Sequence, residues 1–142
     1  MITAKTLMTP DPATCFIGTP VREIARLMLD HDCGEIPVLD EQRRPLGVVT
    51  DRDIAIRIVA TGGDGTATAG EAMTSPVKTV SEDSDLQDCV VLMETAQVRR
   101  VPVVNATGEL VGIVSLADIA LAGQSRATAA VIKEVSTPAA AH

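Results

Sequence analysis

The 142-residue sequence predicts an α/β fold made of two tandem copies, each ordered about as strand, helix, strand, strand, helix. Two observations predict it. The sequence repeats itself without a gap, and short apolar runs alternate with segments whose apolar residues recur at helical spacing. Because there are only two copies, we expect a pair packed about a pseudo-twofold axis, and not a solenoid.

Four segments carry the repeat, and each recurs 65 positions later. They are Met8-Thr9 with Met73-Thr74, IPVL (36–39) with VPVV (101–104), LGVVT (46–50) with VGIVS (111–115), and DIA (53–55) with DIA (118–120). The repeat predicts a first domain at 1–62, a linker at 63–67, a second domain at 68–127 and a C-terminal tail at 128–142. The glycine-rich stretch at 61–66 lacks the lysine of a phosphate-binding loop, and we interpret it as a flexible linker.

The expected elements follow the same order in both copies. A short lead-in helix at 3–8 and 68–73 precedes a brief strand at 14–16 and 79–80. Two strands around a polar turn, at 36–39 and 46–50, precede a second helix that begins near Asp51 and Leu116. Between these strands lies a helix whose predicted buried face is Val21, Ile24, Ala25 and Met28 in the first copy and Leu86, Cys89, Val90 and Met93 in the second.

Composition and charge exclude several classes of function. Twelve basic and nineteen acidic residues give a net charge of −7, which opposes binding to nucleic acid. Phe16 is the only aromatic residue, so a bound base would be held by aliphatic side chains and backbone. No apolar run has the length of a signal peptide or a membrane span. We therefore expect a cytoplasmic protein with no membrane partner.

Cysteine and histidine give little support for catalysis. Cys15, Cys33 and Cys89 form no C-x-x-C pair, and we interpret them as small packing residues; a redox or metal role is the alternative. His31 and His142 are the only histidines and stand apart from each other in the sequence, and His31 is expected at a helix end. The sequence therefore predicts neither an enzyme nor a resident metal or cofactor.

The repeated motifs resemble those of the CBS domain family. The resemblance rests on the Met-Thr lead-in, the apolar-Pro-Val-apolar strand and the Gly-Val-Val-Thr-x-x-Asp segment, and it covers about residues 3–125. Tandem pairs of this kind are called Bateman modules. The stretches GVVTDRDI (47–54) and VRRVPVV (98–104) are especially similar to small stand-alone bacterial members of the family.

The resemblance implies a cleft between the two halves that binds AMP, ADP, ATP or a related adenosyl ligand as a regulatory ligand. In this pattern Asp53 and Asp118 hold the ribose hydroxyls, because a carboxylate accepts two hydrogen bonds from a vicinal diol. Thr50 and Ser115 lie at helix starts, where backbone N–H groups favour phosphate oxygens. The remaining candidate ligand-binding residues lie on the neighbouring strands: Thr14, Cys15, Ile36, Pro37, Thr79, Val80, Arg99, Arg100, Val101 and Pro102.

Several of these residues also have a purely structural interpretation. Thr50 with Asp53 matches a helix capping box, and a cap and a ligand contact can coexist. Pro37 and Pro102 lie within expected strands, so each belongs at a sheet edge or beside a ligand, or simply ends strand pairing. Gly47 and Gly112 indicate either close backbone approach or tight packing, and we favour packing.

Arginines distinguish the second copy from the first. Arg99 and Arg100 precede the second proline-containing strand, where the family uses a basic residue to reach ligand phosphates; the alternative is a solvated pair. Gly34 and Glu35 take those positions in the first copy, and an acid is unfavourable near a phosphate. We therefore expect two unequal sites, with phosphate recognition that depends on the arginines.

The leading functional prediction is a homodimeric, ligand-responsive regulatory module that acts in trans on an unidentified protein. The family's paired domains usually associate through their helical faces. Two alternatives come from other classes: a structural dimerisation module without a ligand, and a redox- or metal-linked stress protein that uses its cysteines.

Overall fold

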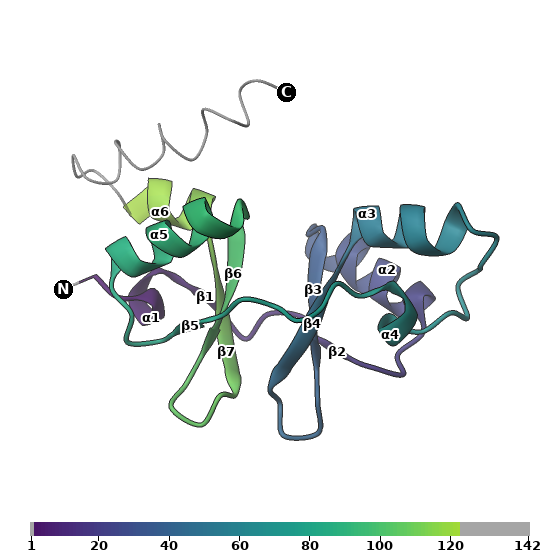
Figure 1. Cartoon of the computed structure of the whole chain (residues 1–142), viewed down its shortest axis with the longest axis horizontal. Helices are drawn as coiled ribbons and strands as arrows, with labels where there is room; N and C mark the ends of the chain where they lie inside the picture. The colour runs from purple at the N-terminus through teal and green to yellow at the C-terminus, as the bar shows by residue number, and fades with distance from the viewer. Residues whose placement is uncertain (1, 123–142) are drawn as a thin grey trace. The chain divides into compact units, whose positions relative to one another are not determined.

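The computed structural model describes residues 2–122, which form two compact units (Figure 1). The Asp53 unit comprises residues 12–77 and 108–110, and the Asp118 unit comprises residues 2–11, 78–107 and 111–122. Each unit is named here for the aspartate of its repeated motif. The predicted tail at 128–142, which includes His142, lies outside the described residues, and the pseudo-twofold packing of the copies stays a prediction.

The Asp53 unit is built on a three-stranded sheet of order β2-β3-β4. Strand β2 (Cys15–Phe16) runs parallel to β3 (Glu35–Leu39), and β3 is antiparallel to β4 (Pro45–Thr50). Helix α2 (Val21–His31) connects β2 to β3, and α3 (Asp51–Asp53) follows β4 directly. A π-helical segment, η1 (Ile54–Val59), and a short helix, α4 (Ala69–Ala72), complete the unit. The predicted order of strand, helix, strand, strand, helix is confirmed.

The Asp118 unit repeats this architecture on a four-stranded sheet of order β1-β7-β6-β5. Its strands are β1 (Thr9–Pro10), β5 (Val80–Ser81), β6 (Arg100–Val104) and β7 (Leu110–Ser115). Its helices are α1 (Ala4–Leu7), α5 (Leu86–Ala96) and α6 (Leu116–Ala122). Strand β5 pairs in parallel with β6, as β2 does with β3 in the Asp53 unit.

Each unit takes its lead-in segment from the other repeat. In the Asp118 unit, β1 of the first repeat pairs with β7, where Thr9 lies opposite Ile113. In the Asp53 unit, Thr74 of the second repeat bridges to Val48 of β4 through two backbone hydrogen bonds of 3.0 and 2.8 Å. The boundaries of the compact units therefore differ from those of the predicted domains at 1–62 and 68–127, which follow the repeats.

The two strand glycines make room for these lead-in segments. A Cβ atom on Gly47 would lie 2.5 Å from the backbone oxygen of Thr74. A Cβ atom on Gly112 would lie 2.4 Å from Sδ of Met8 and 2.9 Å from the oxygen of Thr9. Close backbone approach, which the sequence left as the less favoured alternative, is therefore the reason for glycine at both positions.

The two hydrophobic cores use matched positions of the repeat. Ile36, Val38 and Val49 are buried in the Asp53 unit, and Val101, Val103 and Val114 are buried at the same positions of the Asp118 unit. The predicted buried face of α2 needs one correction: Ala25 is exposed, whereas Val21, Ile24 and Met28 are buried and Leu27 packs against the core. The inward face of α2 is thus rotated toward Leu27.

Both proline-containing strands are central, so the prediction of a sheet edge is wrong. Strand β3 lies between β2 and β4, and β6 lies between β5 and β7. Proline is accommodated because Val48, the partner of Pro37, directs both its N–H and its C=O to Thr74 and not to β3. The backbone nitrogen and oxygen of Pro37 therefore point away from β4, on the side of β2. Strand β2 pairs with β3 only from Val38 onward, so a donor at Pro37 would have no partner there. No ladder bond is lost at this position.

The segment after β4 also differs from expectation. The expected second helix is α-helical only over α3 and then widens into η1, with hydrogen bonds such as Ala60 N–H to the oxygen of Ala55. The stretch at 61–66, interpreted as flexible, is tied to the start of α2. The N–H of Arg22 donates to the oxygen of Gly65 at 3.0 Å, and Asp64 Oδ1 accepts the N–H of Thr66 at 2.9 Å.

Candidate functional site

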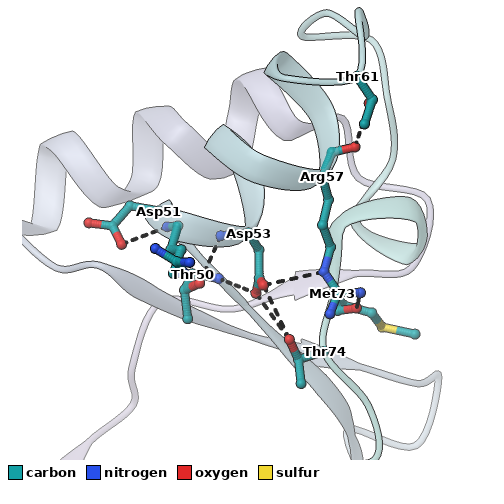
Figure 2. Close-up of polar contacts among 8 residues, drawn as sticks. Thr50, Asp51, Asp53, Arg57, Thr61, Met73 and Thr74 are labelled. Carbon is teal, nitrogen blue, oxygen red and sulfur yellow. Dashed lines mark hydrogen bonds and ion pairs between the residues drawn. The ribbon is translucent and has the colours of Figure 1, made fainter.

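A reciprocal capping box opens the second helix of the Asp53 unit (Figure 2). Thr50 Oγ1 accepts the backbone N–H of Asp53 at 3.0 Å, and Asp53 Oδ2 accepts the backbone N–H of Thr50 at 2.9 Å. The structural interpretation of the Thr-x-x-Asp segment is thus confirmed. A single carboxylate oxygen makes the cap, so the cap alone leaves the other oxygen of Asp53 free for a further contact.

Two residues outside the motif take up that remaining capacity. The hydroxyl of Thr74 lies 3.2 Å from Oδ1 and 3.4 Å from Oδ2 of Asp53. Nε of Arg57 forms an ion pair with Oδ1 at 3.6 Å, and its Nη1 donates to the oxygen of Met73 at 3.2 Å. Figure 2 shows Arg57 reaching back from the helix toward Asp53 while Thr74 approaches the same carboxylate from the lead-in segment. Asp53 is only 8% exposed.

The Asp118 unit has the same box in more open surroundings. Asp118 Oδ2 accepts the N–H of Ser115 at 2.9 Å, and Ser115 Oγ accepts the N–H of Asp118 at 3.0 Å. Asp118 is half-buried, and no ion pair reaches it from residues 2–122. At the positions of Arg57 and Thr74, this unit has Ala122 and Thr9. Its carboxylate thus keeps one oxygen that the cap does not use.

A pocket of about 390 Å³ lies beside this second box. It is lined by Arg99, Arg100, Ser115, Leu116, Ala117 and Ala120. The backbone holds the arginine segment in place, because the oxygen of Arg99 accepts the N–H of Leu116 at 2.8 Å. Both arginines are exposed, so the strand start brings two guanidinium groups to the rim of a cavity that also contains Ser115.

The matched place in the Asp53 unit has the opposite charge. The oxygen of Gly34 accepts the N–H of Asp51 at 3.0 Å, the same backbone contact that Arg99 makes. Here, however, Gly34 and Glu35 replace the arginines, and Asp51 replaces Leu116. A Cβ atom on Gly34 would lie 3.1 Å from Oδ2 of Asp51. The two sites therefore share a backbone frame but differ in the charge that they present.

The other predicted ligand-binding residues fall into three groups. Four have side chains in the hydrophobic cores, so only their backbone groups remain for a ligand: Cys15, Ile36, Val80 and Val101. The prolines Pro37 and Pro102 are also buried within their strands. Thr14 is half-buried and Thr79 is exposed. A ligand contact for these eight residues stays a prediction.

Sequence reasoning missed Arg57 and Thr74. The spacing of Asp53 and Arg57, four positions apart on a helix, was an available signal for an ion pair. The repeated Met-Thr pair is evident in the sequence, but its contact with Asp53 depends on a fold in which the lead-in segment of one repeat reaches the strands of the other repeat. No local pattern encodes such a contact.

The cysteines contribute to packing. Cys15 is 3% exposed and Cys89 is fully buried, each within a hydrophobic core, and Cys33 packs against the core of the Asp53 unit. Burial raises the pKa of the Cys15 thiol to about 11, and burial with the charges of Asp88 and Asp85 raises that of Cys89 to about 11. Among residues 2–122, no group of three metal-ligating side chains gathers.

Histidine and helix length add two smaller observations. His31 is the last residue of α2 and is exposed, as expected for a residue at a helix end. Within the part of the chain that the structure describes, no helix combines the length and apolarity needed to cross a membrane.

Comparison with known proteins agrees with this architecture. The CBS domain family model matches residues 4–60 and 69–125. Hypoxic response protein 1 of Mycobacterium tuberculosis is 36% identical over 141 residues, which cover 99% of this chain and 98% of that protein. An uncharacterized protein of Methanopyrus kandleri is 38% identical over 106 residues, which cover 72% of this chain but 54% of that longer protein.

Solved structures give the same result. A crystal structure of hypoxic response protein 1 with two coordinated zinc ions matches with a TM-score of 0.77 and 38% identity, over 84% of this chain and 97% of that one. CBSX2 in complex with AMP matches with a TM-score of 0.74 and 27% identity, over 86% and 96%. The CBS domain pair of protein MJ0100, in complex with 5′-methylthioadenosine and S-adenosyl-L-methionine, matches with a TM-score of 0.74 and 28% identity, over 86% and 95%. The duplicated strands, the two capping boxes and these matches together show that the chain belongs to the CBS domain family and carries two CBS domains.

Proposed function

We propose that this protein is a regulatory module that senses an adenosine nucleotide, and that the Asp118 unit holds its main site. The observation that carries the proposal is the pocket that brings Arg99, Arg100 and Ser115 together beside the Asp118 capping box. A carboxylate suits the ribose diol of a nucleotide and a cation suits its phosphates, and this unit has both.

The chemistry of each group fits one part of the ligand. Asp118 uses one oxygen for the cap, which leaves the other to accept hydrogen bonds from a ribose diol. The planar guanidinium groups of Arg99 and Arg100 match the geometry of phosphate oxygens. Aliphatic groups of Leu116, Ala117 and Ala120 line the rest of the pocket, as expected for a protein whose only aromatic residue is Phe16.

Related structures support an adenosyl ligand. CBSX2 was crystallised with AMP, and the domain pair of MJ0100 with 5′-methylthioadenosine and S-adenosyl-L-methionine. We propose AMP, ADP or ATP as the ligand because two cations that suit phosphate line the pocket. The resulting function is regulation and not catalysis, with a protein partner that responds to the occupied state.

We further propose that the protein is a homodimer. Large apolar side chains are exposed on helices of both units, including Leu29 of α2, Val91 of α5 and Leu121 of α6. Burial of such residues in a subunit interface would stabilise the dimer. Light scattering at micromolar concentration tests this, and a monomer mass would contradict it.

Calorimetry with AMP, ATP and adenosine tests the nucleotide site. A charge-assisted hydrogen bond contributes about 1.5–3 kcal/mol, or roughly ten- to a hundredfold in affinity. The double variant Arg99→Ala, Arg100→Ala should therefore weaken AMP and ATP far more than adenosine, which lacks the phosphate. Arg52→Ala is the matched control, because it removes an exposed arginine near the capping box of the other unit.

The ribose contact has its own test. Asp118→Asn keeps an oxygen for the cap but removes the charge, and it should weaken AMP more than 2′-deoxy-AMP. Equal affinity of the wild-type protein for AMP and 2′-deoxy-AMP would refute the ribose role. A thermal-shift screen with AMP, ATP, NAD and S-adenosylmethionine that gave no rise in Tm with any ligand would refute the proposed function as a whole.

A further inference from the structure

We infer that Arg57 is a specificity-determining residue of the Asp53 unit, because its guanidinium group competes with a ligand's ribose for the Asp53 carboxylate. The inference rests on the proposed function, since it concerns an adenosine ligand at the capping box of Thr50 and Asp53. It adds a residue that lies outside that box and that restrains binding.

The contacts of Asp53 leave little room for a diol. Oδ2 accepts the N–H of Thr50 at 2.9 Å and faces the hydroxyl of Thr74 at 3.4 Å, and Oδ1 faces the same hydroxyl at 3.2 Å and Arg57 Nε at 3.6 Å. A vicinal diol donates two hydrogen bonds. To accept them, Asp53 must give up at least one of its present partners.

Arg57 is the partner that gives way most easily. The N–H of Thr50 belongs to the backbone at the end of β4. Thr74 is held by two backbone hydrogen bonds to Val48. Arg57, in contrast, has a side chain that is 50% exposed, and its contact with Asp53 is the longest of the set at 3.6 Å. Because water reaches the guanidinium group, solvent and salt screen its attraction to Asp53 and keep the ion pair weak.

The other unit has no such competitor. The residue 65 positions after Arg57 is Ala122, whose side chain carries no charge. Asp118 forms no ion pair within residues 2–122. A ribose at Asp118 therefore displaces nothing, whereas a ribose at Asp53 must displace Arg57. We expect the ligand to bind at Asp118 at a lower concentration than at Asp53.

The test isolates the Asp53 carboxylate in the full-length chain. In an Asp118→Asn background, adenosine and 2′-deoxyadenosine are titrated by calorimetry with and without Arg57→Ala. Removing the competitor should tighten adenosine binding about two- to fivefold, the range expected for a solvent-screened ion pair. Binding of 2′-deoxyadenosine, which cannot offer the diol, should not change. Arg57→Gln is the second variant, since its amide is neutral yet still able to donate to the oxygen of Met73.

A reciprocal variant provides the matched control. Ala122→Arg places an arginine at the same repeat position in the Asp118 unit and, in an Asp53→Asn background, should weaken adenosine by a similar factor. If the wild type binds adenosine but Arg57→Ala and Arg57→Gln leave its affinity unchanged, or tighten both nucleosides equally, the role of Arg57 is overturned and the proposed function stands. If no adenosyl ligand binds the wild type or any variant, both are overturned.

Discussion

Asp53 and Asp118 occupy the same position of the repeat, and each closes a capping box with a bond of 2.9 Å to the N–H three residues earlier. Beyond the box, the two carboxylates differ. Asp53 is buried and meets Thr74 and Arg57, whereas Asp118 is half-buried beside a pocket that carries two arginines.

The difference shows that a local motif fixes the geometry of the cap but not the surroundings of its carboxylate. A cap needs only the four residues of one helical turn, so both copies of the repeat keep it. The surroundings of each carboxylate depend on residues from other elements, such as Arg57 and Arg99, which the repeat does not share between copies. Two capping boxes with the same geometry can therefore differ in burial and in the charge of their neighbours.

The largest expected effect is a difference in stability between alanine variants of the two strand glycines, Gly47 and Gly112. In Gly47→Ala, the new methyl group meets the Thr74 oxygen at 2.5 Å, which hydrogen bonds to Val48 hold in place. We expect a loss of about 1–3 kcal/mol in the free energy of unfolding. Gly112→Ala should cost less, because its nearest contact is the flexible side chain of Met8 and the nearest backbone oxygen, that of Thr9, lies farther away at 2.9 Å.

Urea unfolding measures both changes. Gly18→Ala is the control, since a Cβ atom there has no neighbour within 4 Å. An equal loss for the Gly47 and Gly112 variants would show that the two lead-in segments are held with the same rigidity.

Next in size is the contribution of the two aspartates to stability. Asp53→Ala removes a cap, a hydrogen bond from Thr74 and an ion pair with Arg57, and should cost about 2 kcal/mol. Within residues 2–122, Asp118→Ala removes only the cap, and it should cost about 1 kcal/mol. Thermal unfolding without ligand provides the measurement. A larger loss of stability for Asp118→Ala than for Asp53→Ala would contradict the view that Asp53 makes the more stabilising contacts.

Each unit buries one cysteine in its core, Cys15 or Cys89, which gives a prediction common to both units. Burial raises the pKa of both Cys15 and Cys89 from 9.0 to about 11. Between these two pH values the thiols stay neutral in the folded state but ionise in the unfolded chain. Their contribution to stability is therefore complete below pH 9 and is lost as the pH rises toward 11.

Alkylation with iodoacetamide at pH 8, followed by mass spectrometry, checks the same burial. Cys33, which is half-buried, should react in the native protein, and Cys15 and Cys89 only after unfolding. Rapid native labelling of Cys15 or Cys89 would contradict the packing described for the corresponding unit.

The smallest effect concerns two similar turns. The N–H of Thr66 donates to Asp64 Oδ1 in the Asp53 unit, and the N–H of Thr107 donates to Asn105 Oδ1 in the Asp118 unit, at 2.9 and 3.0 Å. Hydrogen bonds from the hydroxyl and N–H of Thr66 lower the pKa of Asp64 below 3.8. The bond to Asp64 therefore strengthens the fold above pH 3.8 and weakens as the pH falls through the lowered pKa.

An NMR titration distinguishes the turns. The amide signal of Thr66 should shift in the acid range, whereas that of Thr107 should not, because its acceptor is a neutral amide. A matching shift at Thr107 would indicate a general acid transition and not the titration of Asp64.

Much of the fold could be predicted because the sequence pattern of each helix and strand occurs twice, once in each copy of the repeat. Apolar positions such as Ile36 and Val101 agree in both copies, and each proved to be buried. The capping boxes were also predictable, since the interacting atoms lie three residues apart. Arg99 and Arg100 were found by contrast with Gly34 and Glu35, and the pocket in the Asp118 unit places them together.

The features that escaped prediction depend on contacts between distant segments or on the exact rotation of a helix. Thr74 meets Asp53 only because a lead-in segment packs against the strands of the other repeat. Ala25 lies at a suitable spacing but turns to solvent, because Leu27 takes the inward position. The π-helical turn at 54–59 has the same apolar composition as an ordinary helix. None of these is set by the residues of a short window alone.

The exchange of lead-in segments has a consequence for the order of folding during synthesis. The Asp53 unit draws almost all its residues from one continuous stretch, 12–77, so its sheet and core are complete once that stretch has left the ribosome. The Asp118 unit must wait, because Thr9 pairs with Ile113, 104 positions later. Closing so long a loop is slow, since chain entropy is lost before the contact forms. We therefore expect the Asp53 unit to form first, while the nascent N-terminal segment stays unpaired until the last strand of the second repeat emerges.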